Sequence, residues 1–311
     1  MSPKRAVYSM ASLPQSARET LVGFDVYENE AGKEQLARCE VLMAWPTRTK
    51  RELLKNMDDL KMVQALSAGV DGFDFESLPS GVRVYSNAGA YTDSVAEHGW
   101  GLLLGAAKGL HARKVRLVPR KLRGATLLIV GCGSIGCEIA RLGRSIGMKT
   151  LGASRSFKVP EAFDEMYAIR DLKGVIGMAD AIVIALPLTN TTSKMFDYDT
   201  LMLAKEHVTI VNVGRGETVS EMGLIGWLRK RPESRYTTDV FWKKDGRETF
   251  ETDAWQLQNF SGTLHISGTP LGDTLEFPLV EAAKNVRRFL ETGEAQNLVD
   301  INEYLPSFGK D

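Results

Sequence analysis

Short runs of apolar, β-branched residues alternate along the chain with segments in which apolar residues recur at helical spacing. This alternation is typical of parallel sheets whose strands are connected by helices, so we expect an α/β fold. The clearest strand-like runs are residues 40–44, 62–66, 126–130, 181–186 and 208–213. The sequence has no internal repeat of fixed period, which argues against a solenoid.

Two turn-rich segments predict domain boundaries. Residues 85–92 precede a predicted helix that extends to about residue 110, and near its start Ser94 and Glu97 have the spacing of a capping box. The second segment, residues 267–273, is rich in glycine and polar residues and contains a proline.

Beyond the second boundary, apolar residues recur at the spacing of an amphipathic closing helix, at positions 279, 282, 283, 286, 289 and 290. The simplest arrangement is a domain of residues 92–270 inserted into a smaller domain formed by residues 1–91 and 271–311. Ligands are then expected in the cleft between the two domains.

Size and composition agree with two ordinary folded domains. The chain has 311 residues, of which 43% are apolar and 25% charged, and it exceeds the size at which a single core keeps growing. Basic and acidic residues number 39 each. The chain therefore lacks the excess of positive charge that binding to a phosphate backbone requires, and we expect no nucleic-acid partner.

The sequence also predicts no membrane partner and a reducing compartment. No apolar run approaches the roughly 20 residues of a membrane span, and the first residues contain too short an apolar stretch for a secretion signal. Cys39, Cys132 and Cys137 lie outside any zinc-type or redox spacing. We expect them to be small buried residues in a cytoplasmic protein, with no bound metal.

The apolar run 126–130 leads directly into Gly-Cys-Gly-Ser-Ile-Gly, and helical periodicity follows. In a dinucleotide-binding loop of this kind, Gly131 permits the tight turn, Gly133 lets the pyrophosphate approach the backbone, and Gly136 lets the helix pack on the strand. The strand and helix on either side favour dinucleotide binding over a merely structural turn. The expected cofactor contacts are Gly131, Gly133, Ser134, Ile135 and Gly136.

The next predicted strand, residues 149–153, ends at Ser154, Arg155 and Ser156. NAD-preferring sites carry an acidic residue here for the ribose 2'-hydroxyl. A carboxylate would repel a 2'-phosphate, whereas an arginine between two hydroxyls offers charge-assisted donors, and Lys158 adds a further charge. We therefore expect NADP as the cofactor, with NAD, or an ordinary surface loop, as the alternatives.

Further segments occur in the order known from one enzyme family. Residues 179–189 with Thr192, followed by Val-Asn-Val-Gly-Arg-Gly at 211–216, resemble signatures of the D-isomer-specific 2-hydroxyacid dehydrogenases. Residues 67–71, 94–98, 238–241 and 263–266 do so as well. With Ser154, Arg155 and Ser156, the sequence looks like the NADPH-dependent glyoxylate/hydroxypyruvate reductase branch.

The resemblance implies a Rossmann dinucleotide-binding domain inserted into a flavodoxin-like substrate domain, and usually a homodimer built on the Rossmann domain. It implies hydride transfer between a nicotinamide cofactor and a small 2-oxo or 2-hydroxy acid. Two alternatives stay open: a dinucleotide-binding regulatory protein of the same fold with little turnover, and a formate- or phosphite-type oxidation that would use NAD.

The resemblance also implies roles for single residues. Arg215 would hold the carboxylate and carbonyl of a 2-oxo acid, because its guanidinium presents a planar fork of donors. The amides of Gly69 and Val70 would bind the other side of the carboxylate, and His265 would give a proton to the carbonyl oxygen. Further cofactor contacts are expected at Leu186, Pro187, Thr192, Val213, Asp239 and Gly268.

Two other features have more than one interpretation. His98 matches the family pattern but lies within a predicted helix, so we expect it to be structural. The loop of Trp45, Pro46, Thr47 and Arg48 follows a predicted strand and could face the substrate or form a simple turn.

The chain departs from the family at the expected partner of His265. Family members usually carry a glutamate five residues beyond the aspartate matched by Asp239, but Lys244 occupies that position. Asp245 or Glu248 could reach the histidine from a shifted loop, or no carboxylate does. In the last case the imidazolium of His265 loses a stabilising partner, and reduction of the 2-oxo acid should favour acidic pH.

Overall fold

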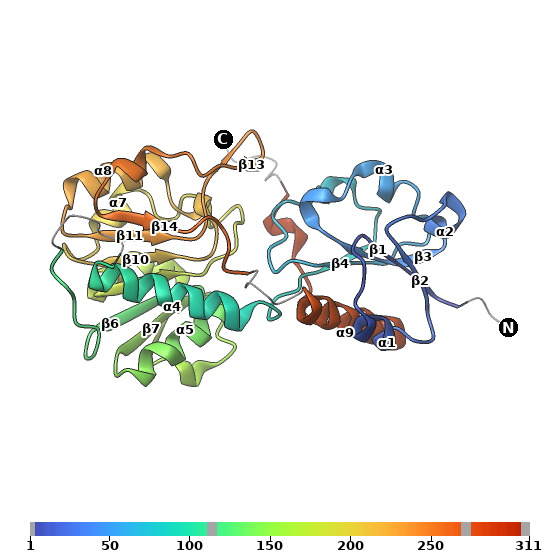
Figure 1. Ribbon diagram of the computed structural model, residues 1–311, viewed down its shortest axis with the longest axis horizontal. Helices are drawn as coiled ribbons and strands as arrows, with labels where there is room; N and C mark the ends of the chain where they lie inside the picture. The colour runs from blue at the N-terminus through green and yellow to red at the C-terminus, as the bar shows by residue number, and fades with distance from the viewer. Residues whose placement is uncertain (1–3, 111–116, 269–274, 306–311) are drawn as a thin grey trace. The chain divides into compact units, whose positions relative to one another are not determined.

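The computed structural model describes residues 4–110, 117–268 and 275–305. The chain forms two compact units: unit 1 comprises Met1–Tyr91 and Leu271–Asp311, and unit 2 comprises Thr92–Pro270. Each unit contains its own parallel sheet with helices packed against it (Figure 1). This confirms the expected α/β fold.

The sheet of unit 1 has the strand order β2-β1-β3-β4-β5, and every neighbouring pair is parallel. The inner strands β1, β3 and β4 are mostly apolar and buried because helices cover both faces of the sheet. Val7 and Met43 pack with α1 and α9 on one face, whereas Tyr8 and Leu42 pack with α2 and α3 on the other. The strands are β1 (Ala6–Ser9), β2 (Asp25–Glu28), β3 (Cys39–Ala44), β4 (Met62–Ala65) and β5 (Arg83–Tyr85), and the helices are α1 (Gln15–Thr20), α2 (Lys33–Ala37), α3 (Arg51–Leu54) and α9 (Glu276–Thr292).

Helix α9 is the predicted closing helix. All six apolar positions that define its predicted face are buried, which confirms the pattern read from the sequence. Figure 1 shows α9 beside α1, against which it packs.

The sheet of unit 2 has the strand order β14-β11-β10-β9-β6-β7-β8 and is also parallel throughout. Helices α4 and α5 pack together on one face, and α7 and α8 pack together on the other (Figure 1). The strands are β6 (Thr126–Val130), β7 (Lys149–Ser154), β8 (Glu165–Ala168), β9 (Ala181–Ile184), β10 (Thr209–Asn212), β11 (Arg235–Thr238) and β14 (Phe260–Gly262), and the helices are α4 (Thr92–Lys108), α5 (Ser134–Ser145), α6 (Leu172–Val175), α7 (Tyr198–Met202) and α8 (Glu221–Lys230).

Shorter elements complete the two units. A two-stranded antiparallel hairpin in unit 2 consists of β12 (Lys243–Lys244) and β13 (Arg247–Glu248). The 3₁₀ helices are Pro46–Arg48, Phe75–Ser77, Pro160–Ala162, Ile169–Asp171, Ile176–Met178, Gly216–Thr218, Asp253–Gln256 and Ile301–Glu303.

Both sheets contain a topological switch point, where successive crossovers leave in opposite directions. In unit 1 the chain passes from β1 to β2 on one side and returns to β3 on the other side of β1. In unit 2 it passes from β6 through β7 to β8 and returns to β9 on the other side of β6. Ligands of open α/β sheets bind outside the carboxyl ends of the strands at such points.

One local expectation is wrong. Helix α4 begins at Thr92, so Ser94 and Glu97 lie inside the helix and cannot form a capping box at its start. The Ser94 hydroxyl instead donates a hydrogen bond to the main-chain oxygen of Ser267. Of the turn expected at 267–273, residues 269–273 lie outside the described residues.

The three cysteines are free and buried, as expected, and burial raises the pKa of the Cys39 thiol to about 11. Among the residues that the structure describes, no helix is long and apolar enough to cross a membrane. Within the same ranges, no cluster of three or more histidine, cysteine or acidic side chains could hold a metal ion.

Candidate active site

The residues expected to carry the chemistry of unit 2 lie at one edge of its sheet. Because all seven strands are parallel, their carboxyl ends share that edge. Gly131 follows β6, Ser154 ends β7, and Asp239 directly follows β11. Arg215 and His265 each lie three residues beyond a strand, β10 and β14 respectively. Topology therefore brings residues spread over much of the unit to one edge.

The loop between β6 and α5 has the backbone that a dinucleotide requires. Gly131 has a φ of +100°, and a Cβ there would lie 2.6 Å from the Ala185 oxygen. A Cβ on Gly136 would lie 2.1 Å from the Gly131 oxygen, so only glycine lets the helix start this close to the loop. Beside Gly133, by contrast, no atom lies within 4 Å of the Cβ position.

Helix α5 begins at Ser134 and has no side-chain cap. Its first amide groups, which include those of Ser134 and Ile135, therefore lack the hydrogen bonds that a capping side chain would accept. Uncapped amides, the positive end of the helix dipole and the open space beside Gly133 together fit the pyrophosphate of a dinucleotide.

The side chains after β7 lie next to this loop. The hydroxyl of Ser154 accepts a hydrogen bond of 3.3 Å from the amide of Cys132, which fixes Ser154 against the phosphate-loop backbone. Arg155, Ser156 and Lys158 are exposed. The basic and hydroxyl groups expected to contact a 2'-phosphate thus follow directly from the end of β7.

The loop after β9 is closed by Thr192. Its hydroxyl donates to the Pro187 oxygen at 2.7 Å and accepts from the Thr189 amide at 2.8 Å. Leu186 is buried, whereas Pro187 is exposed. The Thr192 hydroxyl therefore shapes the loop that presents Pro187, which is a positioning role in addition to any contact with a cofactor.

Arg215 lies in a backbone segment held from several sides. Its main-chain oxygen accepts hydrogen bonds from the side-chain amide of Asn212 at 2.9 Å and from the Thr218 hydroxyl at 2.7 Å. The preceding residues are tied to the sheet, since the amide of Val213 donates to the Ile184 oxygen at 3.0 Å. The backbone that carries the guanidinium is consequently well defined.

The glycines on either side of Arg215 allow close approach to neighbouring chain segments. A Cβ on Gly214 would lie 2.4 Å from the Leu186 oxygen, and one on Gly216 would lie 2.2 Å from the Phe241 oxygen. The Gly-Arg-Gly sequence therefore follows from packing: any side chain at either flank would push Arg215 away from the sheet edge.

His265 has a carboxylate partner. Its Nδ1 lies 2.5 Å from Oε2 of Glu248, and Oε1 of Glu248 accepts a hydrogen bond of 2.7 Å from the amide of Phe241. Glu248 is the second residue of β13. The sequence left Asp245, Glu248 or no carboxylate open as the partner of His265, and the structure shows Glu248 in that position.

The hairpin explains why Glu248 and not Lys244 faces the histidine. Its two-residue turn, Asp245 and Gly246, has positive φ at both positions, +52° and +75°, as a tight hairpin turn requires. In the resulting register Lys243 faces Glu248, and Lys244 faces Arg247. Directly opposed residues share a face and neighbours along a strand alternate, so Lys244 and Glu248 point to opposite faces.

Asp239 anchors the loop that carries His265. Its carboxylate is fully buried and accepts hydrogen bonds from the Thr263 hydroxyl at 2.6 Å and from the amides of Ile266 and Ser267 at 3.0 Å each. Its main-chain oxygen accepts from the His265 amide at 2.8 Å. Burial alone would raise the pKa of Asp239, but these hydrogen bonds outweigh burial and hold the pKa below its ordinary value.

His98 reaches the same loop from α4. Its Nε2 lies 2.7 Å from the Thr263 hydroxyl and 3.5 Å from Oδ1 of Asp239. This contact gives His98 a structural role, as expected, in supporting the segment that bears His265. The main chain of His265 itself has a φ of +53°, a conformation that non-glycine residues seldom adopt, and the anchored loop holds it there.

The candidate residues of unit 1 lie in the loop after β4. The Ser67 hydroxyl donates to the Gly69 oxygen at 2.7 Å, and the Phe73 amide donates to the Val70 oxygen at 3.0 Å. These hydrogen bonds fold residues 67–73 into a compact loop at the carboxyl edge of the sheet. Gly268, in unit 2, lies at the end of the described segment that contains His265.

Known proteins resemble this chain over most of its length. The sequence profile described as D-isomer specific 2-hydroxyacid dehydrogenase, NAD binding domain, matches residues 82–267. A glyoxylate reductase from Aeropyrum pernix is 31% identical over 211 residues, which cover 61% of this chain and 62% of that protein. A glyoxylate reductase from Thermococcus kodakarensis is 30% identical over 244 residues, or 72% of each chain.

A solved structure shows the same fold. A D-isomer specific 2-hydroxyacid dehydrogenase family protein from Aeromonas salmonicida is 26% identical and aligns with a TM-score of 0.78, covering 96% of this chain and 99% of its own. The sequence profile spans more than half of the chain and includes both Arg215 and His265. The chain therefore belongs to the D-isomer specific 2-hydroxyacid dehydrogenase family, a family of NAD(P)-dependent 2-hydroxyacid oxidoreductases.

Proposed function

We propose that this protein is an NADP(H)-dependent 2-oxo acid reductase, a D-2-hydroxyacid dehydrogenase for substrates of the glyoxylate or hydroxypyruvate type. The observation that carries the proposal is the 2.5 Å contact between Nδ1 of His265 and Glu248. Through this contact Glu248 serves as the carboxylate partner of the candidate proton donor, a partner that Lys244, at the position of the usual family glutamate, cannot provide. The two glyoxylate reductase relatives support the substrate type.

The contact assigns the two ring nitrogens of His265. With Nδ1 engaged by Glu248, Nε2 is the nitrogen that gives its proton to the carbonyl oxygen of the substrate. The Glu248 carboxylate stabilises the imidazolium from which this proton comes, and the Phe241 amide holds the carboxylate in place. General acid catalysis of this kind contributes about 10² to 10⁴ in rate.

Arg215 binds the substrate carboxylate and polarises its carbonyl, since the guanidinium can donate to both groups at once. The amides of Gly69 and Val70 bind the carboxylate from its other side. When bound, the reduced nicotinamide supplies the hydride. In this proposal Asp239 lies near the nicotinamide end of the cofactor, and further cofactor contacts are made by Leu186, Pro187, Thr192, Val213 and Gly268.

Unit 2 is the cofactor domain in this proposal, and unit 1 is the substrate domain. The phosphate loop binds the pyrophosphate, and Ser154, Arg155 and Ser156 bind the 2'-phosphate that distinguishes NADP from NAD. A homodimer built on unit 2, which the family resemblance implies, completes the proposal. Its mass in solution, measured by light scattering, tests that part separately.

The principal test is oxidation of NADPH by the purified protein with glyoxylate, hydroxypyruvate, pyruvate and phenylpyruvate. Two variants locate the chemistry. His265→Asn should lower kcat by about 10² or more because it removes the general acid, whereas Arg215→Lys should raise KM and also lower kcat, because it removes the fork of donors that binds the carboxylate and polarises the carbonyl. Lys244→Ala, on the far face of the hairpin, is the matched control and should retain wild-type constants.

The main competing function is a dinucleotide-binding regulator with little turnover. Its support from the sequence was the missing glutamate, and the Glu248–His265 contact removes that support. Binding of NADPH with no measurable oxidation by any of the four acids would favour the regulator and overturn the reductase.

A further inference from the structure

Two segments of unit 2 that serve different side chains of the site lie against each other. Residues 216–219 directly follow Arg215, and residues 241–243 lead into the hairpin that carries Glu248. The first segment continues the chain beyond β10 and the second continues it beyond β11, and these two strands are neighbours in the sheet. Strand pairing therefore brings the two segments together at the carboxyl edge.

The main link between the segments is a hydrogen bond from Trp242. Its indole Nε1 donates to the main-chain oxygen of Val219 at 2.8 Å, and both residues are buried. A buried indole N–H requires an acceptor, so this bond is strongly favoured. The main-chain oxygen of Trp242 accepts from the Thr249 amide at 3.0 Å, directly beyond β13. Trp242 thus joins the hairpin to the segment that follows Arg215.

Two further contacts link the same segments. A Cβ on Gly216 would lie 2.2 Å from the main-chain oxygen of Phe241, so the two backbones touch there. The amide of Lys243 donates to Oε1 of Glu217 at 3.2 Å. The three contacts occur at neighbouring positions along both segments and together fix the distance between them.

The segment of residues 216–219 is itself held from its other side. The amide of Lys194 donates to the main-chain oxygen of Glu217 at 2.8 Å, and the amide of Phe196 donates to that of Thr218 at 3.0 Å. Both donors belong to the chain between β9 and α7. The segment therefore forms a fixed support, against which Trp242 places the hairpin.

Each segment also contacts the chemistry of the site. In the first, the Thr218 hydroxyl donates to the main-chain oxygen of Arg215 at 2.7 Å. In the second, the Phe241 amide donates to Glu248 at 2.7 Å, and the other carboxylate oxygen of Glu248 contacts Nδ1 of His265. A shift of one segment against the other would consequently move Glu248 relative to Arg215.

We propose that Trp242 is a positioning residue, whose hydrogen bond to Val219 sets the place of Glu248, and through it of His265, relative to Arg215. The inference rests on the proposed function, because it requires the imidazole and the guanidinium to act on one substrate. A misplacement of about 1 Å can cost about 10² in rate. Loss of one of the three contacts leaves the other two, so we expect a smaller loss of about tenfold.

The first test is Trp242→Phe, which keeps an aromatic ring and removes the N–H donor. Its kcat for glyoxylate should fall by about tenfold, while the Kd for NADPH should stay at the wild-type value because the phosphate loop takes no part in these contacts. Trp255→Phe is the matched control. The indole of Trp255 donates to the Phe250 oxygen at 2.8 Å, within the loop after the hairpin, so its loss should leave kcat unchanged.

A double-mutant cycle separates positioning from a merely structural role. In a Glu248→Ala background the hydrogen bond of Trp242 has no carboxylate left to place, so Trp242→Phe should lower kcat by less than about twofold. A structural role would lower kcat by the same factor in both backgrounds, because independent effects add in free energy. Equal factors would therefore overturn the proposal.

A second pair of variants tests the same link if Trp242→Phe does not fold. Glu217→Ala removes the acceptor of the Lys243 amide and should lower kcat by about threefold to tenfold, less than a full misplacement costs. Glu217→Gln keeps a carbonyl acceptor and should recover most of that loss. Equal losses in the two variants would contradict positioning through this hydrogen bond.

The outcomes distinguish this proposal from the reductase itself. Turnover of glyoxylate by the wild type, with the same kcat in folded Trp242→Phe, would overturn the positioning role and leave the reductase intact. Absence of turnover by the wild type with every acid tested would overturn the reductase and the positioning role with it.

Discussion

Glu248 and His265 are joined by a contact of 2.5 Å between Oε2 and Nδ1, and the carboxylate is held from its other oxygen by the amide of Phe241 at 2.7 Å. Both contacts depend on the hairpin of β12 and β13. Glu248, in the second strand of the hairpin, contacts the histidine, whereas the first strand carries Lys244 at the position where a glutamate was expected. A main-chain donor on the carboxylate leaves it little freedom to turn away from the imidazole.

Glu248→Gln should slow the reduction of glyoxylate at neutral pH by about tenfold to a hundredfold, a part of what general acid catalysis contributes. The amide keeps the shape of the carboxylate but carries no charge, so it stabilises the positive charge of the proton donor His265 less well. Steady-state kcat and KM for glyoxylate measure this.

Glu251→Gln removes the same charge from an exposed position beyond the hairpin and serves as the control. It should leave kcat and KM at the wild-type values. A loss in Glu248→Gln that is confined to KM, or that accompanies a lower melting temperature, would show that Glu248 acts on substrate binding or on folding instead of on the proton donor.

Asp239→Asn should destabilise the protein by about 3 kcal/mol at neutral pH, because the buried carboxylate accepts from three donors that an amide satisfies poorly. The pKa of Asp239 is lowered in the folded protein, so its stabilisation is fully present above the unfolded pKa of about 3.9 and is lost as pH falls through the lower folded value. Urea unfolding at neutral and at acidic pH should show the difference shrinking in acid.

Asp245→Asn is the control for this substitution. Asp245 is exposed in the hairpin turn at a φ of +52°, which asparagine also tolerates. Its free energy of unfolding should stay within about 0.5 kcal/mol of the wild type. Equal effects of the two substitutions would contradict the anchoring role of Asp239.

Arg155→Ala should weaken NADPH binding by about tenfold to a hundredfold, the value of a charge-assisted hydrogen bond. NADH binding should change little, because NADH has no 2'-phosphate to lose a contact. Fluorescence titration of the two nucleotides measures both constants. Arg170→Ala removes another exposed arginine of unit 2 and should affect neither. Equal weakening of NADPH and NADH by Arg155→Ala would exclude the 2'-phosphate contact.

Gly136→Ala should lower the stability of the protein by about 1 to 3 kcal/mol and weaken the binding of either nucleotide. The added methyl group would overlap the Gly131 oxygen, 2.1 Å away, and separate α5 from the phosphate loop. Gly174→Ala is the control, since the Cβ there would meet no atom within 4 Å. Thermal unfolding with and without NADPH distinguishes the two, and an undisturbed melting temperature in Gly136→Ala would refute the packing argument.

The sequence alone predicted those features that depend on a short stretch of chain, where steric requirements or helical periodicity act between neighbouring residues. The run from β6 through the three glycines to α5 predicted the strand, the turn and the helix, because each glycine meets a steric requirement of the adjacent backbone. The buried face of α9 was readable for the same reason: helical periodicity alone specifies which side chains share a face.

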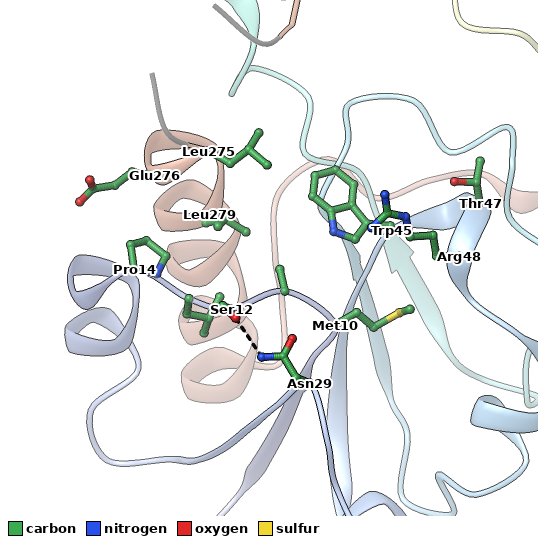
Figure 2. A pocket seen from close by; sticks show the side chains of 12 residues that line it. Met10, Ser12, Pro14, Asn29, Trp45, Thr47, Arg48, Leu275, Glu276 and Leu279 are labelled. Atoms are coloured by element: carbon green, nitrogen blue, oxygen red, sulfur yellow. Dashed lines mark hydrogen bonds between the residues drawn. The ribbon is translucent and has the colours of Figure 1, made fainter. Parts of the chain in front are cut away.

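The tertiary structure decided the features that depend on the pairing of distant segments. Residue spacing left Asp245, Glu248 or no carboxylate as the partner of His265, and the hairpin register settled the choice, although the Asp-Gly pair at its turn was a usable signal. Ser94 has the spacing of a cap but bonds to the loop of Ser267 instead. A pocket in unit 1 arises where the segments that follow β1, β2 and β3 meet the start of α9 (Figure 2). No spacing along the chain encodes such proximity, because it comes from packing between segments far apart in sequence.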